Sequence, residues 1–238
     1  MKTSKLISLI LVIVFTTNAY GQIRLRVTGS GKVVSEERKA GYFNAVEVSS
    51  GIDVYLSQGQ KESITVEADD NLHEYIITEV RNNTLKVYSK ANIRKAEAKK
   101  VHVTIKDVEK ISVSSAGDVY GETLIKTDEL SLSASSAGDI KLKIEVTRLK
   151  CRISSSGDID LEGIADELEA DLSSAGDLKA FDLKTRIADV STSSAGDARI
   201  TVTEKLRARA SSAGDIYYKG NPKQVDAHSS SAGGIHKK

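Results

Sequence analysis

The chain has 238 residues, enough for one sizeable domain or two small ones. Its 34 Lys and Arg residues against 33 Asp and Glu residues leave a net charge of +1, which argues against electrostatic attraction to nucleic acid or to an acidic membrane. Aromatic residues make up only 5% of the sequence, tryptophan is absent, and a single proline suits long hydrogen-bonded strands, which proline interrupts.

The first 21 residues have the pattern of a secretory signal peptide. Two lysines precede an apolar run over residues 6–15, which is too short to span a bilayer comfortably. Ala19 and Gly21 put small side chains where a signal peptidase reads them, which predicts cleavage before Gln22. An uncleaved membrane anchor is the alternative. We therefore expect an exported protein, in the periplasm, on the outer-membrane surface or secreted, with no transmembrane segment in the mature chain.

Residues 22–108 are rich in predicted strands but do not repeat cleanly. Polar and apolar residues alternate with the period of a strand over 22–28, 45–56, 63–68, 84–89 and 101–105. The Asn-Asn pair at 82–83 indicates a turn, and residues 71–80 fit either a short helix or a strand. We expect this part to form a cap and the first coils of a repetitive structure, because an open end would expose unpaired strand edges.

The C-terminal part, 109–238, repeats the phrase SSAGD. Five copies match it in full, SSSGD stands at 154–158, SSAGG stands at 230–234, and residues 49–53 look like a degenerate first copy. The glycines of the seven copies are Gly117, Gly138, Gly157, Gly176, Gly196, Gly214 and Gly233. Successive glycines are 18 to 21 residues apart, a period typical of stacked architectures in which each repeat buries its apolar face against its neighbours.

The residues around each glycine alternate between apolar and polar. Small or apolar residues recur eight, six and four positions before the glycine and two and four positions after it. This period of two belongs to strands and excludes a helical solenoid. Separate hairpins would not need the same corner in every repeat, whereas stacked coils do, since equivalent residues lie about 4.8 Å apart. We predict an all-β fold: a single-stranded parallel β-helix, or β-solenoid, with coils of about 19–20 residues and an irregular strand-rich cap.

The repeated phrase predicts a tight corner between two strands. We expect its glycine to adopt a backbone conformation that other residues resist. Strand parity predicts that the second serine of each copy points inward, where a column of hydroxyls would hydrogen-bond along the stack. These serines are Ser115, Ser136, Ser155, Ser174, Ser194, Ser212 and Ser231. The corner residues are then structural and need no ligand.

Six aspartates follow the corner glycines with outward parity: Asp118, Asp139, Asp158, Asp177, Asp197 and Asp215. Stacking would place them in a column in which neighbouring carboxylates repel by about 1 kcal/mol even in water. Three means of compensation are open: a carboxylate that accepts N–H groups of its own turn, neighbouring lysines, or calcium shared between carboxylates. We favour the first, because the short glycine-rich repeats of calcium-binding β-rolls are absent, and keep the calcium ladder as an alternative.

No catalytic pattern stands out in the sequence. Glycoside hydrolysis needs two carboxyl groups in different environments, whereas the six aspartates occupy equivalent positions. His73, His102, His228 and His236 have no metal-like spacing and are expected to be solvated. Cys151 falls at an apolar repeat position and is expected in the core, since a lone cysteine forms no internal disulfide. We predict a protein that is not an enzyme and has no catalytic residue, cofactor or resident metal.

Several segments together resemble a known bacterial family. These are GYFNAVEVSSGIDVYLSQGQKESITVEAD at 41–69, NLHEYIITEV at 71–80, TLKVYS at 84–89, and the SSAGD coils. The combination resembles the auto-transporter adhesin head GIN domain family, common in Bacteroidetes, over nearly all of 29–235. The resemblance implies a β-helical fold and a location outside the cytoplasm, and the family name suggests adhesion. It offers no catalytic residues to carry over.

Together these features predict a secreted or cell-envelope β-helix that binds or scaffolds an extended partner, such as an extracellular polysaccharide or a surface protein. A carbohydrate-active β-helix enzyme is one alternative, and a cleft with two unequal carboxylates would favour it. A purely structural envelope protein is another. Nucleic acid is not an expected partner. The C-terminal coil is expected to offer a strand edge through which the chain could form an oligomer.

Overall fold

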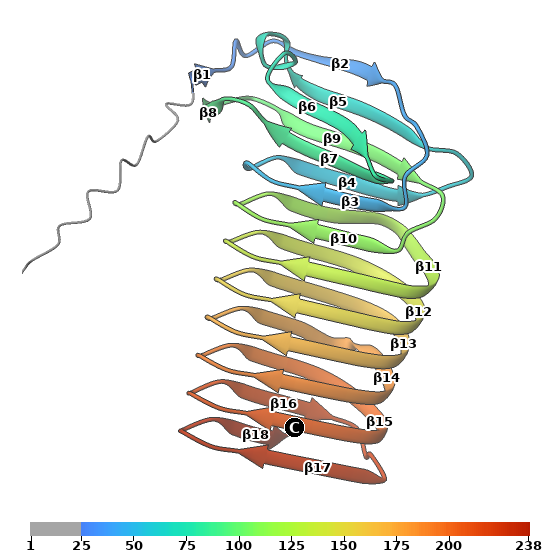
Figure 1. Cartoon of the computed structure of the whole chain (residues 1–238), viewed down its shortest axis with the longest axis vertical. Coiled ribbons are helices and arrows are strands. Elements are labelled where there is room, and N and C mark those ends of the chain that lie inside the picture. Colours follow the sequence, from blue (N-terminus) through green and yellow to red (C-terminus); the bar gives the residue numbers. More distant parts are fainter. Residues whose placement is uncertain (1–24) are drawn as a thin grey trace, which may run out of the picture.

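The computed structural model describes residues 25–238, so the predicted signal peptide and its cleavage site lie outside the described residues. The strands stack into an elongated solenoid with two faces and a cap at its N-terminal end (Figure 1). One sheet contains 16 strands, and β1 (Arg26–Thr28) and β8 (Asn92–Lys95) form a separate two-stranded sheet. The predicted all-β fold with a parallel β-helix is confirmed.

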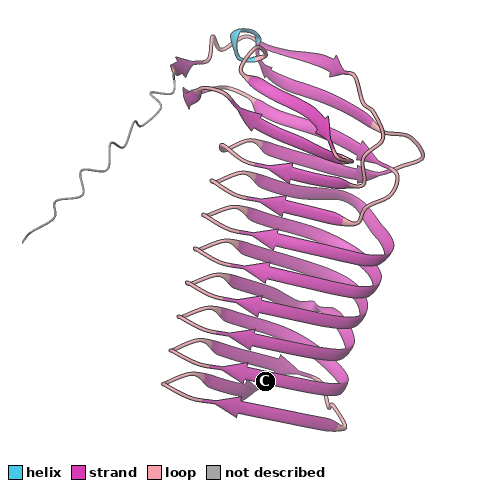
Figure 2. Ribbon diagram, viewed as in Figure 1, coloured by secondary structure: helices cyan, strands magenta, loops and turns pink. Residues whose placement is uncertain are grey.

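In each regular coil a long strand rounds one blunt edge of the solenoid, and a pointed corner closes the opposite edge (Figure 2). The long strands are β11 (Asp118–Ala134), β12 (Asp139–Ile153), β13 (Asp158–Leu172), β14 (Asp177–Thr192) and β15 (Asp197–Ala210). Shorter strands complete the outer coils: β3 (Ala45–Val48), β4 (Asp53–Gln58), β10 (Lys110–Val113), β16 (Asp215–Lys219), β17 (Gln224–Ser229) and β18 (Gly234–Lys237). Neighbouring coils pair in parallel, with Ile140 opposite Ile159 and Ile159 opposite Leu178. Equivalent residues therefore stack, as the repeat predicts.

The corners divide the solenoid into two faces. We name the face formed by the strands that lead into the corners the pre-corner face; it contains β3, β10, the C-terminal parts of β11 to β15, and β17. The post-corner face contains β4, the N-terminal parts of β11 to β15, β16 and β18. Outward side chains on each face form columns along the solenoid axis, because every coil repeats the same register.

The cap departs from parallel pairing. β2 (Val33–Arg38) pairs antiparallel with β5 (Ser63–Asp69), which pairs with β9 (Lys99–Ile105), and β6 (Ile76–Arg81) pairs with β7 (Thr84–Ser89). The choice left open at 71–80 is resolved as the short 3-10 helix η1 (Asp70–Leu72) followed by β6. The Asn82-Asn83 turn is confirmed. β10 pairs with β3, which lies before the proposed boundary at 108/109, and with β11, which lies after it. The boundary stays a prediction.

One cluster of buried apolar side chains fills the space between the two faces. The residues six positions before the corner glycines are buried as predicted in five of the coils: Leu132, Cys151, Ala170, Val190 and Ala208. Burial raises the pKa of the Cys151 thiol to about 12, so this cysteine is an unreactive core residue. The last coil covers its apolar residues less well, and Val225 is 48% exposed.

Two buried polar residues hold the cap together. The Asp69 carboxylate accepts backbone N–H groups of Gly31, Glu97 and Ala98 at 2.8 to 3.0 Å. Burial opposes its ionisation, but these bonds bring its pKa below the ordinary value. His73, expected to be solvated, is only 6% exposed, and its Nε2 lies 3.2 Å from the Ala68 carbonyl oxygen. That expectation was wrong because η1 turns this side chain back beneath the cap strands.

Candidate functional site

Each SSAGD phrase forms a type I′ turn. In the copy at 154–157 the Gly157 amide donates to the Ser154 carbonyl at 3.1 Å, and Ser155 and Ser156 between them have φ angles of 51° and 60°. The second and third residues of all seven copies have positive φ. Two left-handed residues in succession give the sharp reversal of the pointed corner, at a cost of about 1–2 kcal/mol for each non-glycine residue.

The corner glycine has a different role from the expected one. Gly157 does not have positive φ, so the prediction that glycine supplies the unusual backbone conformation was wrong. A Cβ placed on Gly157 would instead lie 2.7 Å from the backbone carbon of Ala134 and 2.8 Å from the amide nitrogen of Ser135 in the preceding coil. Glycine is needed because adjacent corners stack too closely for a side chain.

The second serine of the corner points outward, and the prediction of an inward hydroxyl column was also wrong. Ser136 and Ser155 are exposed, because strand alternation breaks where two residues adopt the left-handed conformation. Backbone groups hold the column together: the Ala137 amide donates to the Ser155 carbonyl, and the Ser156 amide to the Ser174 carbonyl, each at 3.1 Å. Within residues 25–238 no hydrogen bond joins the hydroxyls of two corner serines.

The six aspartates do form a column on the post-corner face. The carboxylate of Asp118 accepts the amide of Asp139 at 3.1 Å, and that of Asp139 accepts the amide of Asp158 at 3.3 Å; Asp177 and Asp197 are related in the same way. These bonds cross to the next coil instead of closing the carboxylate's own turn, because parallel register places the next amide beside each carboxylate. Hydrogen bonds from neutral backbone amides stabilise the ionised carboxylates without a positively charged side chain.

Cations complete this compensation. The Lys179 Nζ lies 2.6 Å from Asp158, and the Arg199 guanidinium lies 3.1 Å from Asp197. Repulsion persists at Asp139, where burial and then the charges of Asp118 and Asp158 raise the carboxyl pKa. Within residues 25–238 no group of three or more His, Cys, Asp and Glu side chains is arranged to hold a metal ion, and the calcium ladder stays a prediction.

Stacked rings beside this column were missed by the sequence reading. The Tyr55 ring stacks on His102 at 5.2 Å and lies 5.6 Å from Tyr120, and Tyr217 stacks on His236 at 5.1 Å. Aligning residues 53–55 with 118–120 would have found the pair of Tyr55 and Tyr120, because both segments read Asp-Val-Tyr. Since the rings cover one another's faces, they offer little free aromatic surface to a sugar.

The pre-corner face carries charges in rows along single strands. We name three of them: the first basic row is Arg148, Lys150 and Arg152; the acidic row is Glu167, Glu169 and Asp171; the second basic row is Lys205, Arg207 and Arg209. The first basic row and the acidic row lie on adjacent strands, with Lys150 opposite Glu169. The strand of Ile187, Asp189 and Ser191 separates the acidic row from the second basic row.

These rows are only partly neutralised within the chain. Lys150 pairs with Glu169, and Arg207 pairs with Asp189 at 3.6 Å. Four row residues have no ion pair within residues 25–238: Arg152, Glu167, Asp171 and Lys205. Like charges two residues apart on a strand are about 6.6 Å apart and repel by about 0.6 kcal/mol in water. If the sign of the charge alternated along each strand, this repulsion would be avoided and ion pairs between neighbouring strands would still form. The stability of the fold alone therefore does not explain rows of one sign.

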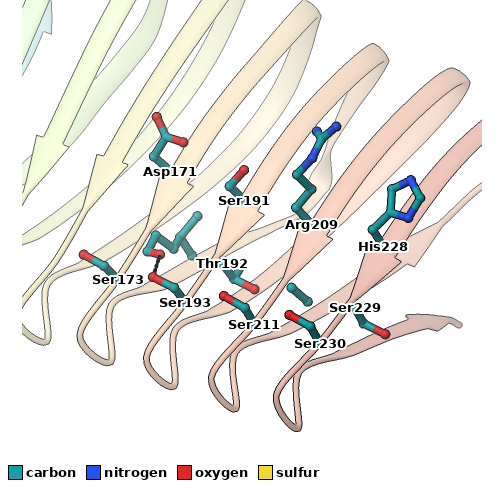
Figure 3. A pocket seen from close by; sticks show the side chains of 12 residues that line it. Asp171, Ser173, Ser191, Thr192, Ser193, Arg209, Ser211, His228, Ser229 and Ser230 are labelled. Atoms are coloured by element: carbon teal, nitrogen blue, oxygen red, sulfur yellow. Dashed lines mark hydrogen bonds between the residues drawn. The ribbon is translucent and has the colours of Figure 1, made fainter.

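Two grooves cross the rows and run along the solenoid axis. One, of about 500 Å³, has Asp171, Arg209 and His228 on one side and the first serines of the corners, such as Ser193, on the other. Figure 3 shows these side chains projecting from successive coils in two parallel lines. The second groove, of about 1040 Å³, runs past Glu129, Arg148, Glu167 and Glu169 on the same face. The pre-corner face is therefore hollowed over many coils.

None of the helical turns within 25–238 is long and apolar enough to cross a lipid bilayer. Solved structures similar to this chain come from bacteria. A protein described as a "putative adhesin" from Bacteroides fragilis NCTC 9343 is 24% identical, with a TM-score of 0.82 over 89% of this chain and 100% of its own. A "putative lipid binding protein" from Parabacteroides distasonis ATCC 8503 is also 24% identical, with a TM-score of 0.73 over 90% of this chain and 99% of its own.

At this identity the structural likeness shows the fold alone. A search of functionally curated proteins finds no match to this sequence. The sequence profile described as "Putative auto-transporter adhesin, head GIN domain" matches residues 42–222, which span most of the cap and all but the last of the regular corners. The chain therefore belongs to the auto-transporter adhesin head GIN domain family.

Proposed function

We propose that this protein is exported and acts as a non-catalytic binding and scaffold module in adhesion at the cell envelope. The observation that carries this proposal is the pre-corner face, where two grooves extend over successive coils and pass three charged rows. A surface that repeats along an axis suits a partner that is itself extended or flat. The family's description as an adhesin head supports the same role.

The chemistry of this face favours a protein surface as the partner. Exposed rows of Arg, Lys, Glu and Asp can pair with charged side chains, whereas a neutral polysaccharide offers no charge to them. The stacked tyrosine and histidine rings of the post-corner face leave few free ring faces for sugars. An extracellular polysaccharide is kept as the alternative partner.

The same residues argue against the alternative of a carbohydrate-active enzyme. The aspartates of the column occupy equivalent positions, and Asp118, Asp139 and Asp177 each accept the amide of the next coil, whereas a hydrolase needs an acid and a base or nucleophile in different environments. Among the described residues, the groove beside the corners has one carboxylate, Asp171, and in the larger groove Glu129 and Glu169 are paired with Arg148 and Lys150. We propose that no sugar bond is cleaved here.

The last coil supports a second, smaller contact. β17 is paired with β15 and with no further strand among those described, and Val225 on it is 48% exposed. We propose that this edge can pair with another chain, as expected from the sequence. Replacing Val225 with lysine would weaken such pairing, because a charged side chain at a sheet edge opposes strand addition.

Bead adhesion tests the proposed function. Beads coated with residues 22–238 are allowed to settle on whole cells of the producing strain and on immobilised polysaccharides, and retention under flow is counted. We expect retention on cells, lost at least tenfold when the acidic row is reversed by E167K, E169K and D171K. The matched control, E145K, D160K and E162K, makes the same charge change on other exposed strand positions and should retain the beads. No retention by the wild-type chain would favour a purely structural protein, and release of reducing sugar would favour the enzyme.

A further inference from the structure

The geometry points to a second copy of this chain as the partner of the pre-corner face. Two copies dock face to face with their solenoid axes antiparallel, so that the acidic row of each lies opposite the second basic row of the other. This inference rests on the proposed function, because it names the partner of the face already assigned to adhesion. The contact would join molecules on facing surfaces.

The register of the strands supplies the complementarity. Glu167 lies beside Ile187, which lies beside Lys205, and Asp171 is related to Arg209 in the same way through Ser191. The acidic row and the second basic row therefore occupy the same positions along their strands, two coils apart. A two-fold axis along the strand of Ile187 and Ser191 brings each acidic residue onto a basic residue of the other copy.

The remaining row, the first basic row, meets one acidic residue in this arrangement. The same axis places Lys150 of the first basic row opposite Asp226 of the other copy, because both lie two coils from the axis. At the axis Ile187 meets Ile187, which adds an apolar contact. Asp189 meets Asp189, but each keeps ion pairs at 3.6 and 3.9 Å with Arg207 and Arg209 of its own chain.

The charges that would form this interface are available. All nine row side chains reach the surface, and four of them have no ion pair among residues 25–238. The net charge of +1 means that two copies do not repel at long range. A partner of one uniform sign, such as an anionic polymer, would meet the acidic row as well as the basic rows, whereas a second copy offers both signs at the right spacing.

The expected contact is weak and sensitive to salt. Five coils at about 4.8 Å, each with about six residues at about 3.3 Å, give a footprint of about 480 Å² per copy. This is below the roughly 800 Å² per partner of a stable complex, so single pairs exchange readily. Many copies on a surface would raise the apparent affinity through avidity.

Mixing of two reversed variants tests the inference. One variant reverses the acidic row (E167K, E169K, D171K), and the other reverses the second basic row (K205E, R207E, R209E). Each should self-associate at least tenfold more weakly than the wild-type chain in sedimentation velocity at about 50 mM salt, because like rows then face each other. An equimolar mixture should regain wild-type association, because each reversed row then faces an opposite charge.

The controls separate this interface from other contacts. K141E, K143E and K219E match the second variant in charge on the post-corner face and should associate like wild type, and V225K should leave the face contact intact. Wild-type association should fall at least tenfold at about 500 mM salt. Circular dichroism confirms that each variant is folded before it is scored.

The possible results are distinct. A wild-type chain that stays monomeric at every concentration, or reversed variants that do not complement each other, would overturn the inference. If the wild-type chain is monomeric while its beads still adhere to cells and lose retention when the acidic row is reversed, the proposed function stands with a different partner. If neither self-association nor adhesion is seen, both proposals fail.

Discussion

The two faces of the solenoid handle charge in opposite ways. On the post-corner face the aspartates repeat with one sign from coil to coil, and the chain itself compensates them with amides, Lys179 and Arg199. On the pre-corner face the charge changes from coil to coil, and four row residues have no partner among residues 25–238. The charges that repeat in every coil are thus compensated within the stack, whereas the charges that change from coil to coil are left available to another molecule.

The largest expected effect concerns the corner glycine. Gly157→Ala should lower the free energy of unfolding by about 1–3 kcal/mol, because its Cβ would collide with backbone atoms of Ala134 and Ser135. Chemical denaturation measures the loss, and Gly41→Ala is the control, since nothing lies within 4 Å of a Cβ there. Equal effects of the two substitutions would show that corner stacking does not require glycine.

A substitution at Ser156 tests the other feature of the corner, the positive φ of its second and third residues, separately from the close stacking at the glycine. Ser156→Gly should raise the free energy of unfolding by about 0.5–1 kcal/mol, because relief of the left-handed conformation outweighs the greater freedom of glycine in the unfolded chain. The measurement is the same denaturation curve. A clear loss of stability would mean that Ser156 contributes something beyond its backbone conformation.

The aspartate column predicts a smaller, pH-dependent effect. Burial, then Asp118 and Asp158, raise the pKa of Asp139, so the folded state disfavours its ionised form and loses stability as pH rises above the ordinary value of 3.8. Asp139→Asn keeps an oxygen for the Asp158 amide and removes the charge. It should stabilise the protein by a few tenths of a kcal/mol at pH 7 and by nothing below about pH 3. A destabilised variant at pH 7 would show that the charge itself holds the column.

Much of the fold could be predicted because the repeat is regular. Period-two alternation and the spacing of Gly117 through Gly233 determine strand type, coil length and the buried position of Cys151. The corner's internal geometry could not be predicted, since Ser155 and Ser156 adopt a conformation that their residue types disfavour and alternation breaks there. The burial of His73 depends on how η1 folds into the cap, which has no repeat to guide it.

The candidate site was hidden for a related reason. The charges of the acidic row and the second basic row are visible in the sequence, but their separation by a single strand follows only from the pairing of Glu169 with Asp189 and of Asp189 with Arg207. The aspartates recur in the repeated phrase and are conspicuous in the sequence, whereas each charged row occurs on one strand only. In a repeat protein the positions that vary between coils deserve the search for a binding surface.

The most direct test of the central claim, that the repeated aspartates are satisfied by the chain itself, is the thermal unfolding midpoint of residues 22–238 with millimolar calcium and then with excess chelator. We predict the same midpoint in both, within about one degree, because amides of the next coil and nearby cations already compensate these carboxylates. A rise of several degrees with calcium would contradict this account and make the column a metal site.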